Sequence, residues 1–216
     1  MTHDAAHKVH LGAAHFDAKA REWDLNPVFI DRAIRIAAGI RAAVPLRQDM
    51  RALDYGCGTG MLSFPLSDSL GHIVLEDASP GMLEVVKEKL AAQGVTNMTP
   101  RLADPRVASL QNERFDLIYS SMVLHHIPDT AAILHTWHDQ LTSGGWLCIA
   151  DLVKEDGSFH GIEVDVHHGF DTDRLLALTL AAGFAVPRVV TVLQIAKEQP
   201  SGPREYPVFL LVAQKN

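Results

Sequence analysis

LDYGCGTG, from Leu53 to Gly60, is the stretch that decides the fold of this 216-residue chain. It ends a short apolar strand, predicted over residues 51–55, with three glycines at alternate positions. A glycine-rich turn between a strand and a helix presents backbone N–H groups to a ligand, and the missing side chains allow a close approach. The helix is expected from about Met61, with Pro65 early enough in it to be tolerated. The stretch therefore predicts a nucleotide-binding loop after the first strand of a parallel sheet.

Downstream of this loop, short apolar runs alternate with amphipathic ones, which is typical of a parallel sheet with helices on both faces. Further strands are predicted over residues 72–77, 98–102, 115–121, 146–151, 189–196 and 208–213. Helices are predicted over residues 80–93, 130–141 and 172–182. The segment from Lys154 to Phe170 is expected to be irregular. The last two strands, joined by a polar loop over residues 197–206, indicate an antiparallel hairpin at the sheet edge.

The residues before the first strand predict a helical cap. Apolar side chains recur there at helical spacing at Phe29, Ala33, Ile36, Ala37 and Ile40. We divide the chain into a flexible tail (1–12), an N-terminal helical cap (13–46) and one α/β domain (47–216). Trp23 of the cap either anchors the cap on the domain or contacts the ligand. The expected fold is a doubly wound, mostly parallel, seven-stranded Rossmann-like sheet with a terminal antiparallel hairpin.

Composition and charge narrow the class of partner. With 19 Lys and Arg against 26 Asp and Glu, the formal charge is −7. This disfavours nucleic acid and anionic membranes, so a small-molecule partner is expected. No apolar stretch approaches the roughly 18 residues of a membrane span, and the first ten residues lack the apolar segment of a secretion signal, which predicts a cytoplasmic protein. Cys57 and Cys148 are expected to be reduced thiols without a catalytic role.

Acidic side chains around the loop indicate which nucleotide it holds. A dinucleotide fingerprint needs glycine at the position of Met61, which weakens a diphosphate-binding role. Asp54, directly before the loop, suits a cationic ligand, and S-adenosylmethionine carries a sulfonium and an ammonium. At the end of the second strand, Glu76 and Asp77 can accept hydrogen bonds from ribose hydroxyls, and either can take this role. Asp104, after the third strand, can accept one from an adenine amino group.

Five segments in register carry a family resemblance: LDYGCGTG (53–60), DASPGML (77–83), FDLI (115–118), LHHI (124–127) and SGGWL (143–147). Their order and spacing resemble the motifs of class I S-adenosylmethionine-dependent methyltransferases that act on small molecules. The resemblance implies S-adenosylmethionine as the cofactor, with the loop around its methionine moiety, and the DxS register favours Asp77 for the ribose. We expect cofactor contacts from Asp54, Gly56, Cys57, Gly58, Gly60, Glu76, Asp77, Ala103, Asp104 and Ser120.

Histidines near the predicted carboxyl ends of the strands are the candidates for catalysis. Methyl transfer from a sulfonium is an in-line displacement, in which alignment of the two reactants contributes about 7–11 kcal/mol. A general base is needed only if the acceptor carries a proton. His125 and His126, after the fourth strand, can act as this base or shape the pocket. His168 is the third candidate, since it lies in the irregular segment that we expect to face the acceptor.

The same segment holds three histidines and two carboxylates: His160, Glu163, Asp165, His167 and His168. They are compatible with a metal site, a substrate base or an inert polar loop. Because no HxH or HxxxH spacing occurs there, we expect no metal. His135 and His138, on the preceding helix, are expected to form a solvated face.

Two other functions compete with methyl transfer. The fourth strand ends without the Asn/Asp-Pro-Pro-aromatic motif of enzymes that methylate amino groups of nucleic acids. A fold that binds S-adenosylmethionine or S-adenosylhomocysteine without catalysis, as a sensor or scaffold, is the alternative function. A nicotinamide oxidoreductase is disfavoured by Met61.

Overall fold

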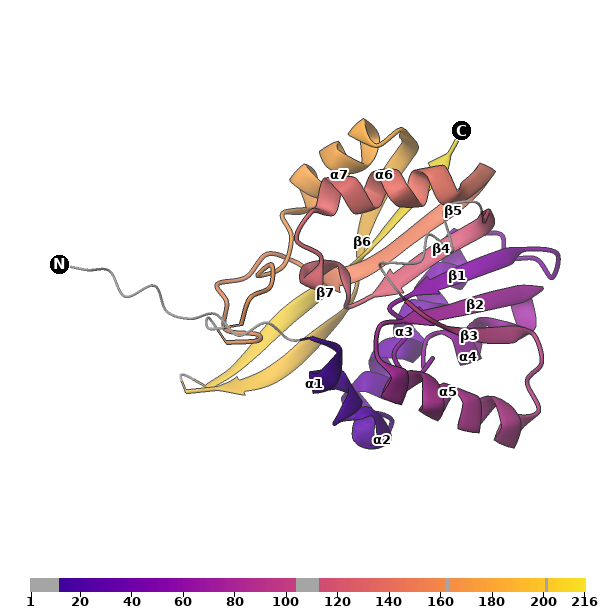
Figure 1. Ribbon diagram of the computed structural model, residues 1–216. Helices are drawn as coiled ribbons and strands as arrows, with labels where there is room; N and C mark the ends of the chain where they lie inside the picture. Colours follow the sequence, from indigo (N-terminus) through magenta and orange to yellow (C-terminus); the bar gives the residue numbers. More distant parts are fainter. Residues whose placement is uncertain (1–11, 104–112, 162–163, 201) are drawn as a thin grey trace.

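The computed structural model describes residues 12–103, 113–161, 164–200 and 202–216, and its sheet has the predicted Rossmann-like architecture (Figure 1). The strands are β1 (Arg51–Tyr55), β2 (His72–Asp77), β3 (Met98–Leu102), β4 (Phe115–Ser121), β5 (Leu141–Leu152), β6 (Phe184–Gln199) and β7 (Gly202–Lys215). Their order in the sheet is β3-β2-β1-β4-β5-β7-β6. Neighbours from β3 to β5 pair in parallel, whereas β7 runs antiparallel to both β5 and β6. The chain reverses its direction of winding between β1 and β4, and open sheets bind ligands at the carboxyl ends of such strands.

Helices cover both faces of the sheet, and their ends follow local capping signals. The helices are α1 (Ala13–Asp17), α2 (Ala20–Trp23), α3 (Pro27–Ala43), α4 (Ser63–Leu66), α5 (Pro80–Gln93), α6 (Thr130–Gln140) and α7 (Thr172–Ala181), with 3-10 turns η1 (Ser67–Ser69) and η2 (Leu124–His126). The Ser79 side chain accepts a hydrogen bond from the Met82 backbone, and α5 ends at Gly94, whose φ is 65°. Asp129 caps α6 in the same way. No helix among these described residues is long and apolar enough to cross a membrane.

Two hydrophobic cores flank the sheet. On one face, α3, α4 and α5 pack on the strands through residues that include Ile36, Leu66 and Val86. On the other, α6 and α7 pack through Trp137 and Leu175, which contact a second set of strand residues. Alternate residues of one strand enter different cores, as expected for a sheet that is buried on both faces. The fold class predicted from the sequence is therefore confirmed.

Three local predictions were wrong. The helix after the glycine loop begins at Ser63 rather than near Met61, and it is a single turn that is followed directly by the 3-10 turn η1. The fifth strand begins at Leu141, since residues 143–145 continue the strand through a register irregularity opposite β4 instead of forming a turn before it.

The terminal hairpin is also much longer than predicted. Residues 197–206 are not a loop, because Lys197 pairs with Arg204 and Gln199 with Gly202 across β6 and β7. The sequence did not indicate these strands because their side chains are mostly polar. This part of the hairpin extends past the rest of the sheet, and most of its β6 residues are exposed or only partly buried (Figure 1).

The α3 packing gives a stability test with an internal control. Ile36 is fully buried in the core, whereas Ile34, two residues earlier on the same helix, is 54% exposed. We expect Ile36→Ala to lower the free energy of unfolding by about 2–5 kcal/mol, because a buried cavity replaces the side chain. Ile34→Ala should change it by less than about 0.5 kcal/mol. Urea denaturation of both variants measures the difference, and equal losses would contradict this packing.

Candidate functional site

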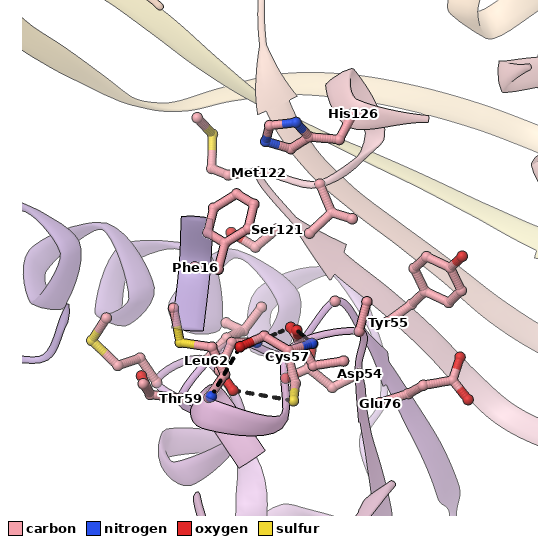
Figure 2. Close-up of a pocket in the computed structure, with 18 of the residues that line it drawn as sticks. Phe16, Asp54, Tyr55, Cys57, Thr59, Leu62, Glu76, Ser121, Met122 and His126 are labelled. Atoms are coloured by element: carbon pink, nitrogen blue, oxygen red, sulfur yellow. Dashed lines mark hydrogen bonds between the residues drawn. The ribbon is translucent and has the colours of Figure 1, made fainter. Parts of the chain in front are cut away.

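A cavity of about 350 Å³ lies at the carboxyl ends of β1, β2 and β4, beneath the N-terminal helices. One wall is made by the glycine loop and by the end of β2. The opposite wall is made by α1, α3 and the segment after β4 (Figure 2). Its lining includes Phe16, Trp23, Phe29, Arg32, Asp54, Gly56, Cys57, Gly58, Met61, Glu76, Asp77, Ala103, Ser121, Met122 and His126.

The glycine loop is held against β2 by its own backbone. The N–H groups of Gly56 and Cys57 both donate to the Glu76 carbonyl oxygen, at 2.8 and 2.9 Å. Gly56 has a φ of 71°, and a Cβ there would lie 2.5 Å from the Val123 side chain. Gly58 also has a positive φ, of 55°, but a Cβ there would meet no atom within 4 Å. Gly56 is therefore required by packing, whereas Gly58 leaves space open on the cavity side.

Asp77 connects this loop to α5. Its Oδ2 accepts a hydrogen bond from the Gly58 N–H at 2.7 Å, and its Oδ1 accepts one from the Ser79 N–H at 2.8 Å. A carboxylate has about four acceptor positions, so two remain for a ligand in the cavity. Burial raises the pKa of Asp77, while backbone hydrogen bonds from Ser79, Gly58 and Ala78 oppose that rise. The side chain therefore both shapes the loop and offers acceptors to a pair of hydroxyl groups.

Two further carboxyl groups that line the cavity have strongly raised pKa values. Asp54 is buried, its Oδ2 accepts a 2.6 Å hydrogen bond from the Ser63 hydroxyl, and burial raises its pKa to about 7. Burial likewise raises the pKa of Glu76 to about 7, although Arg101 opposes this rise. A bound cation would favour the ionised form of either group. This end of the cavity therefore suits a positively charged ligand.

The raised pKa of Asp54 predicts how the free energy of unfolding varies with pH in the absence of ligand. Its pKa is about 7 in the folded chain against 3.8 ordinarily, so between these values the folded state binds more protons than the unfolded state. Its contribution to the free energy of unfolding should therefore decrease as the pH rises from about 4 to 7. Asp54→Asn should flatten this slope. Urea denaturation at several pH values tests this, and an unchanged slope in the variant would contradict it.

The N-terminal helices are fixed over the cavity by polar contacts to the domain. Asp17 accepts hydrogen bonds from the Ser79 hydroxyl at 2.6 Å and from the Gly81 N–H at 2.8 Å. Lys89 bridges Asp24 and the Thr59 carbonyl oxygen at 2.6 and 2.8 Å. These contacts join α1 and α2 to the first turn of α5 and to the glycine loop. The cap therefore closes the cavity on the side away from the sheet.

Aromatic side chains form the underside of this cap. The Trp23 ring lies 4.7 Å from that of Phe29 and 6.1 Å from that of Phe16, and all three line the cavity. Trp23 thus anchors the cap and also borders the ligand space, so both roles considered from the sequence are compatible with its position. Phe16 in turn packs against His126, with 5.6 Å between ring centroids.

Arg32, on α3, contributes a positively charged side chain to the cavity lining. Its guanidinium lies 4.7 Å from the centre of the Phe29 ring, and burial lowers its pKa to about 10. Within the described part of the chain it makes no hydrogen bond or ion pair. Its planar set of donors is therefore available for a carboxylate of a ligand.

Histidines gather beside the cavity at η2. His125 is buried, and its Nδ1 lies 2.8 Å from Oδ1 of the buried Asp151 at the end of β5. Burial raises the pKa of this carboxyl, but its interactions with His125 outweigh that effect and lower the pKa below its ordinary value. His126 lines the cavity. His160 packs on His125 from the irregular segment, with ring centroids 4.7 Å apart, and burial lowers its pKa to about 3.

The structure places most of the predicted cofactor residues in the cavity lining. Lining positions are occupied by Asp54, Gly56, Cys57, Gly58, Glu76, Asp77 and Ala103. Gly60 and Ser120 lie outside it, and the Ser120 hydroxyl donates to the Tyr55 carbonyl oxygen, while its neighbour Ser121 lines the cavity. Asp104 falls outside the described residues. Burial raises the pKa of the Cys57 thiol well above its ordinary value, so this lining cysteine is a poor nucleophile.

The predicted catalytic histidines separate in space. His126 borders the cavity, His125 lies behind it, and His168 packs against Gly157 outside the lining. His168 and its neighbour His167 point apart in this extended segment, and His167 Nε2 lies 2.9 Å from the Ile127 carbonyl oxygen. His135 is exposed as expected, but His138 is only partly exposed because its ring packs on that of Phe184.

Arg32 and Asp151 were missed by the sequence analysis. Asp151 could have been found, because a carboxylate at the carboxyl end of a central strand faces the ligand edge of the sheet. Arg32 gave no signal, since no local pattern distinguishes it from Arg35 and Arg41 on the same helix α3.

Fold and site together define a Rossmann-like protein with a ligand-sized cavity at the end of a glycine loop. A family model described as a methyltransferase domain matches residues 46–176. A solved S-adenosylmethionine-dependent methyltransferase from Aquifex aeolicus has the same fold, with a TM-score of 0.69 and 19% identity over 93% of this chain and 98% of that one. The chain belongs to the S-adenosylmethionine-dependent methyltransferase family.

Curated relatives are similar over the same region. Ubiquinone biosynthesis O-methyltransferase of Cereibacter sphaeroides is 28% identical over 162 residues, which cover 68% of this chain and 65% of that protein. Trans-aconitate 2-methyltransferase of Rhodococcus jostii is 29% identical over 151 residues, which cover 67% of this chain and 55% of that protein. The chain therefore spans only part of the length of these relatives.

Proposed function

We propose that this protein transfers a methyl group from S-adenosylmethionine to a small-molecule acceptor. The observation that carries the proposal is the cavity itself, which joins a glycine loop and a buried carboxylate on one wall to aromatic and histidine side chains on the other. When bound, S-adenosylmethionine supplies an electrophilic methyl group on a positively charged sulfur. The residues of the chain then have to hold the two reactants in line and exclude water.

The residues of the first wall fit this cofactor. Asp77 retains acceptor positions for the ribose hydroxyls, and the open side of Gly58 leaves room for the methionine moiety against the backbone. Asp54, whose carboxyl ionises near neutral pH, lies where the cationic part of the cofactor would be favoured. From α3 in the opposite wall, Arg32 provides a cation for a carboxylate group, such as the one on the methionine moiety. Ala103 contributes an apolar surface at the end of β3.

The second wall fits a small acceptor. Phe16, Phe29 and Met122 give it an apolar surface, and His126 is the titratable group that reaches it from η2. His126 either removes a proton from the acceptor or positions it. The cavity measures about 350 Å³ and the cap lies over it, which is compatible with a small acceptor. Because the relatives named above include an O-methyltransferase of ubiquinone biosynthesis and a methyltransferase of trans-aconitate, phenols and carboxylic acids are the acceptor classes to test first.

Turnover with a methyl-labelled cofactor tests the proposal. The chain is incubated with S-adenosylmethionine carrying a deuterated methyl group and with a panel of phenols, carboxylic acids, amines and thiols. We expect S-adenosylhomocysteine and a labelled product to form in equal amounts with at least one acceptor class. Binding of S-adenosylhomocysteine without labelled product across the panel would favour the alternative, a binding protein that acts as a sensor or scaffold.

A further inference from the structure

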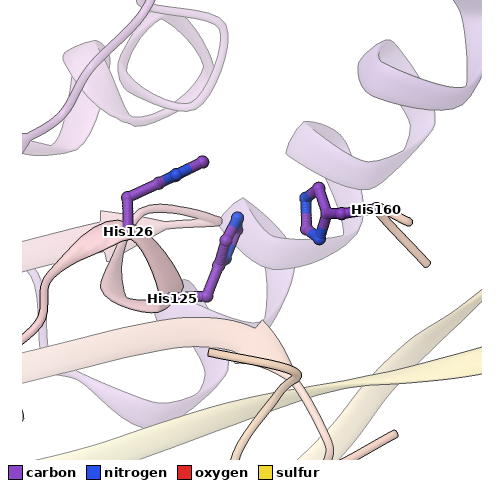
Figure 3. Close-up of side chains that lie close together, drawn as sticks. All are labelled: His125, His126 and His160. Carbon is purple, nitrogen blue, oxygen red and sulfur yellow. The ribbon is translucent and has the colours of Figure 1, made fainter. Parts of the chain in front are cut away.

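Three histidine rings converge behind the acceptor wall of the cavity. His125 and His126 follow each other in the 3-10 turn η2, and His160 reaches them from the irregular segment after β5 (Figure 3). One ring nitrogen of each residue lies within 4.8 Å of the corresponding nitrogens of the other two. His160 lies 34 and 35 positions after His126 and His125, so no local spacing indicates the cluster, and it differs from the group considered in the sequence.

Asp151 fixes the orientation of the His125 ring, which lies between the other two. Its carboxylate accepts from His125 Nδ1 at 2.8 Å and from the His125 backbone N–H at 3.1 Å. A carboxylate can only accept, so Nδ1 carries the proton and Nε2 presents its lone pair to the other two rings. Histidines that bind metals commonly donate their second ring nitrogen to a carboxylate in this way. The His125–Asp151 pair therefore has the arrangement of a metal ligand and its supporting group.

His160, the third ring of the cluster, has one unsatisfied nitrogen. Its Nδ1 is buried and makes no hydrogen bond to any residue that the structure describes. Of two cations in this region, Lys197 donates to the Phe159 carbonyl oxygen, whereas Arg32 lies over Phe29 and interacts with Asp151 only through its charge. The buried charge of Asp151 is available to offset that of a bound cation.

We propose that His125, His126 and His160 bind a divalent transition-metal ion of the zinc type. Three imidazoles suit zinc, cobalt, nickel or copper, whereas magnesium and calcium prefer oxygen ligands. Coordination at about 2 Å requires the three nitrogens to move closer together, and His160 lies in a turn that can adjust. Three protein ligands leave a fourth position open, as in catalytic zinc sites.

The open position gives the ion a role at the acceptor. His126 lines the cavity, so an ion bound to it lies at the cavity wall and can hold an oxygen or sulfur atom of the acceptor. This role rests on the proposed function, whereas metal binding itself does not. The same three rings could relay protons without any metal, and the experiment separates these two cases.

Metal titration of the full-length chain tests the proposal. His3, His7 and His10 are first replaced by glutamine, because three histidines in the first ten residues could bind metal on their own. In this background we expect one equivalent of zinc by calorimetry, and cobalt to give the visible spectrum of a tetrahedral site. His160→Ala should lose at least tenfold in zinc affinity, and Asp151→Asn about 10- to 100-fold. His135→Ala, on the exposed face of α6, should bind zinc as the background does.

Measuring the binding of S-adenosylhomocysteine distinguishes loss of the metal site from unfolding of the variant and from failure of the proposed function. His160 does not line the cavity, so His160→Ala should retain its affinity for S-adenosylhomocysteine, which also shows that the variant is folded. A background protein that binds neither zinc nor cobalt stoichiometrically overturns the metal site, as does unchanged zinc affinity in His160→Ala. Failure of S-adenosylhomocysteine to bind would instead count against the proposed function and would leave the metal result intact.

Discussion

Replacing Asp77 with alanine is expected to weaken the binding of S-adenosylhomocysteine by about 10- to 150-fold. The carboxylate retains acceptor positions for the ribose hydroxyls, and loss of a hydrogen bond to a charged group costs about 1.5–3 kcal/mol. The variant also releases the Gly58 and Ser79 N–H groups, which loosens the loop. Isothermal titration of S-adenosylhomocysteine into the wild type and the variant measures the change.

Two controls make the Asp77 result specific. Asp77→Asn keeps one acceptor oxygen and should lose less affinity than Asp77→Ala. Asp173→Ala removes an exposed carboxylate from the first turn of α7, away from the cavity, and should bind as the wild type does. If Asp77→Ala stays within twofold of the wild type, Asp77 does not hold the ribose.

Gly58→Ala is expected to produce the second large loss of cofactor affinity, of about 10- to 100-fold. A Cβ at Gly58 meets no atom of the protein within 4 Å, and Gly58 lines the cavity, so we expect the added carbon to meet the ligand instead. Forcing an extra carbon against a closely packed partner costs about 1–3 kcal/mol. The positive φ of 55° adds about 1–2 kcal/mol of backbone strain to the folded state, whether or not ligand is present.

Gly94→Ala separates steric exclusion from backbone strain. Gly94 ends α5 with a φ of 65°, and a Cβ there also meets nothing within 4 Å, but the residue does not line the cavity. Both variants should therefore lose a similar amount of stability in urea denaturation, while only Gly58→Ala loses affinity for S-adenosylhomocysteine. Equal affinities in the two variants would show that the cofactor does not approach Gly58.

The sequence predicted the succession of strands and helices along the chain because these have strong local signals. The helices predicted over residues 80–93 and 130–141 lie close to these bounds in the structure, where Ser79 and Asp129 cap them and Gly94 ends the first. The ends of some strands were less predictable, because backbone pairing with a neighbouring strand sets them rather than the types of residue that they contain. The polar arm from Lys197 onward pairs with β7 through its backbone, so its side chains carry little sign of the strand.

The site was predictable where it depends on one segment and unpredictable where it joins several. The loop glycines and Asp77 lie in contiguous motifs, and the structure brings them into one wall. By contrast, His160 meets His125 only because β5 returns the chain to the end of β4. Arg32 enters the cavity from a helix that precedes the whole sheet. Such long-range contacts leave no periodic pattern in the sequence.

Parallel calorimetric titrations of the wild-type chain with S-adenosylhomocysteine and with NAD test the central claim most directly. The glycine loop, Asp54 and Asp77 should give saturable binding of one equivalent of S-adenosylhomocysteine and no binding of NAD at the same concentration. Absence of S-adenosylhomocysteine binding, or saturable binding of NAD, would contradict the assignment of this cavity.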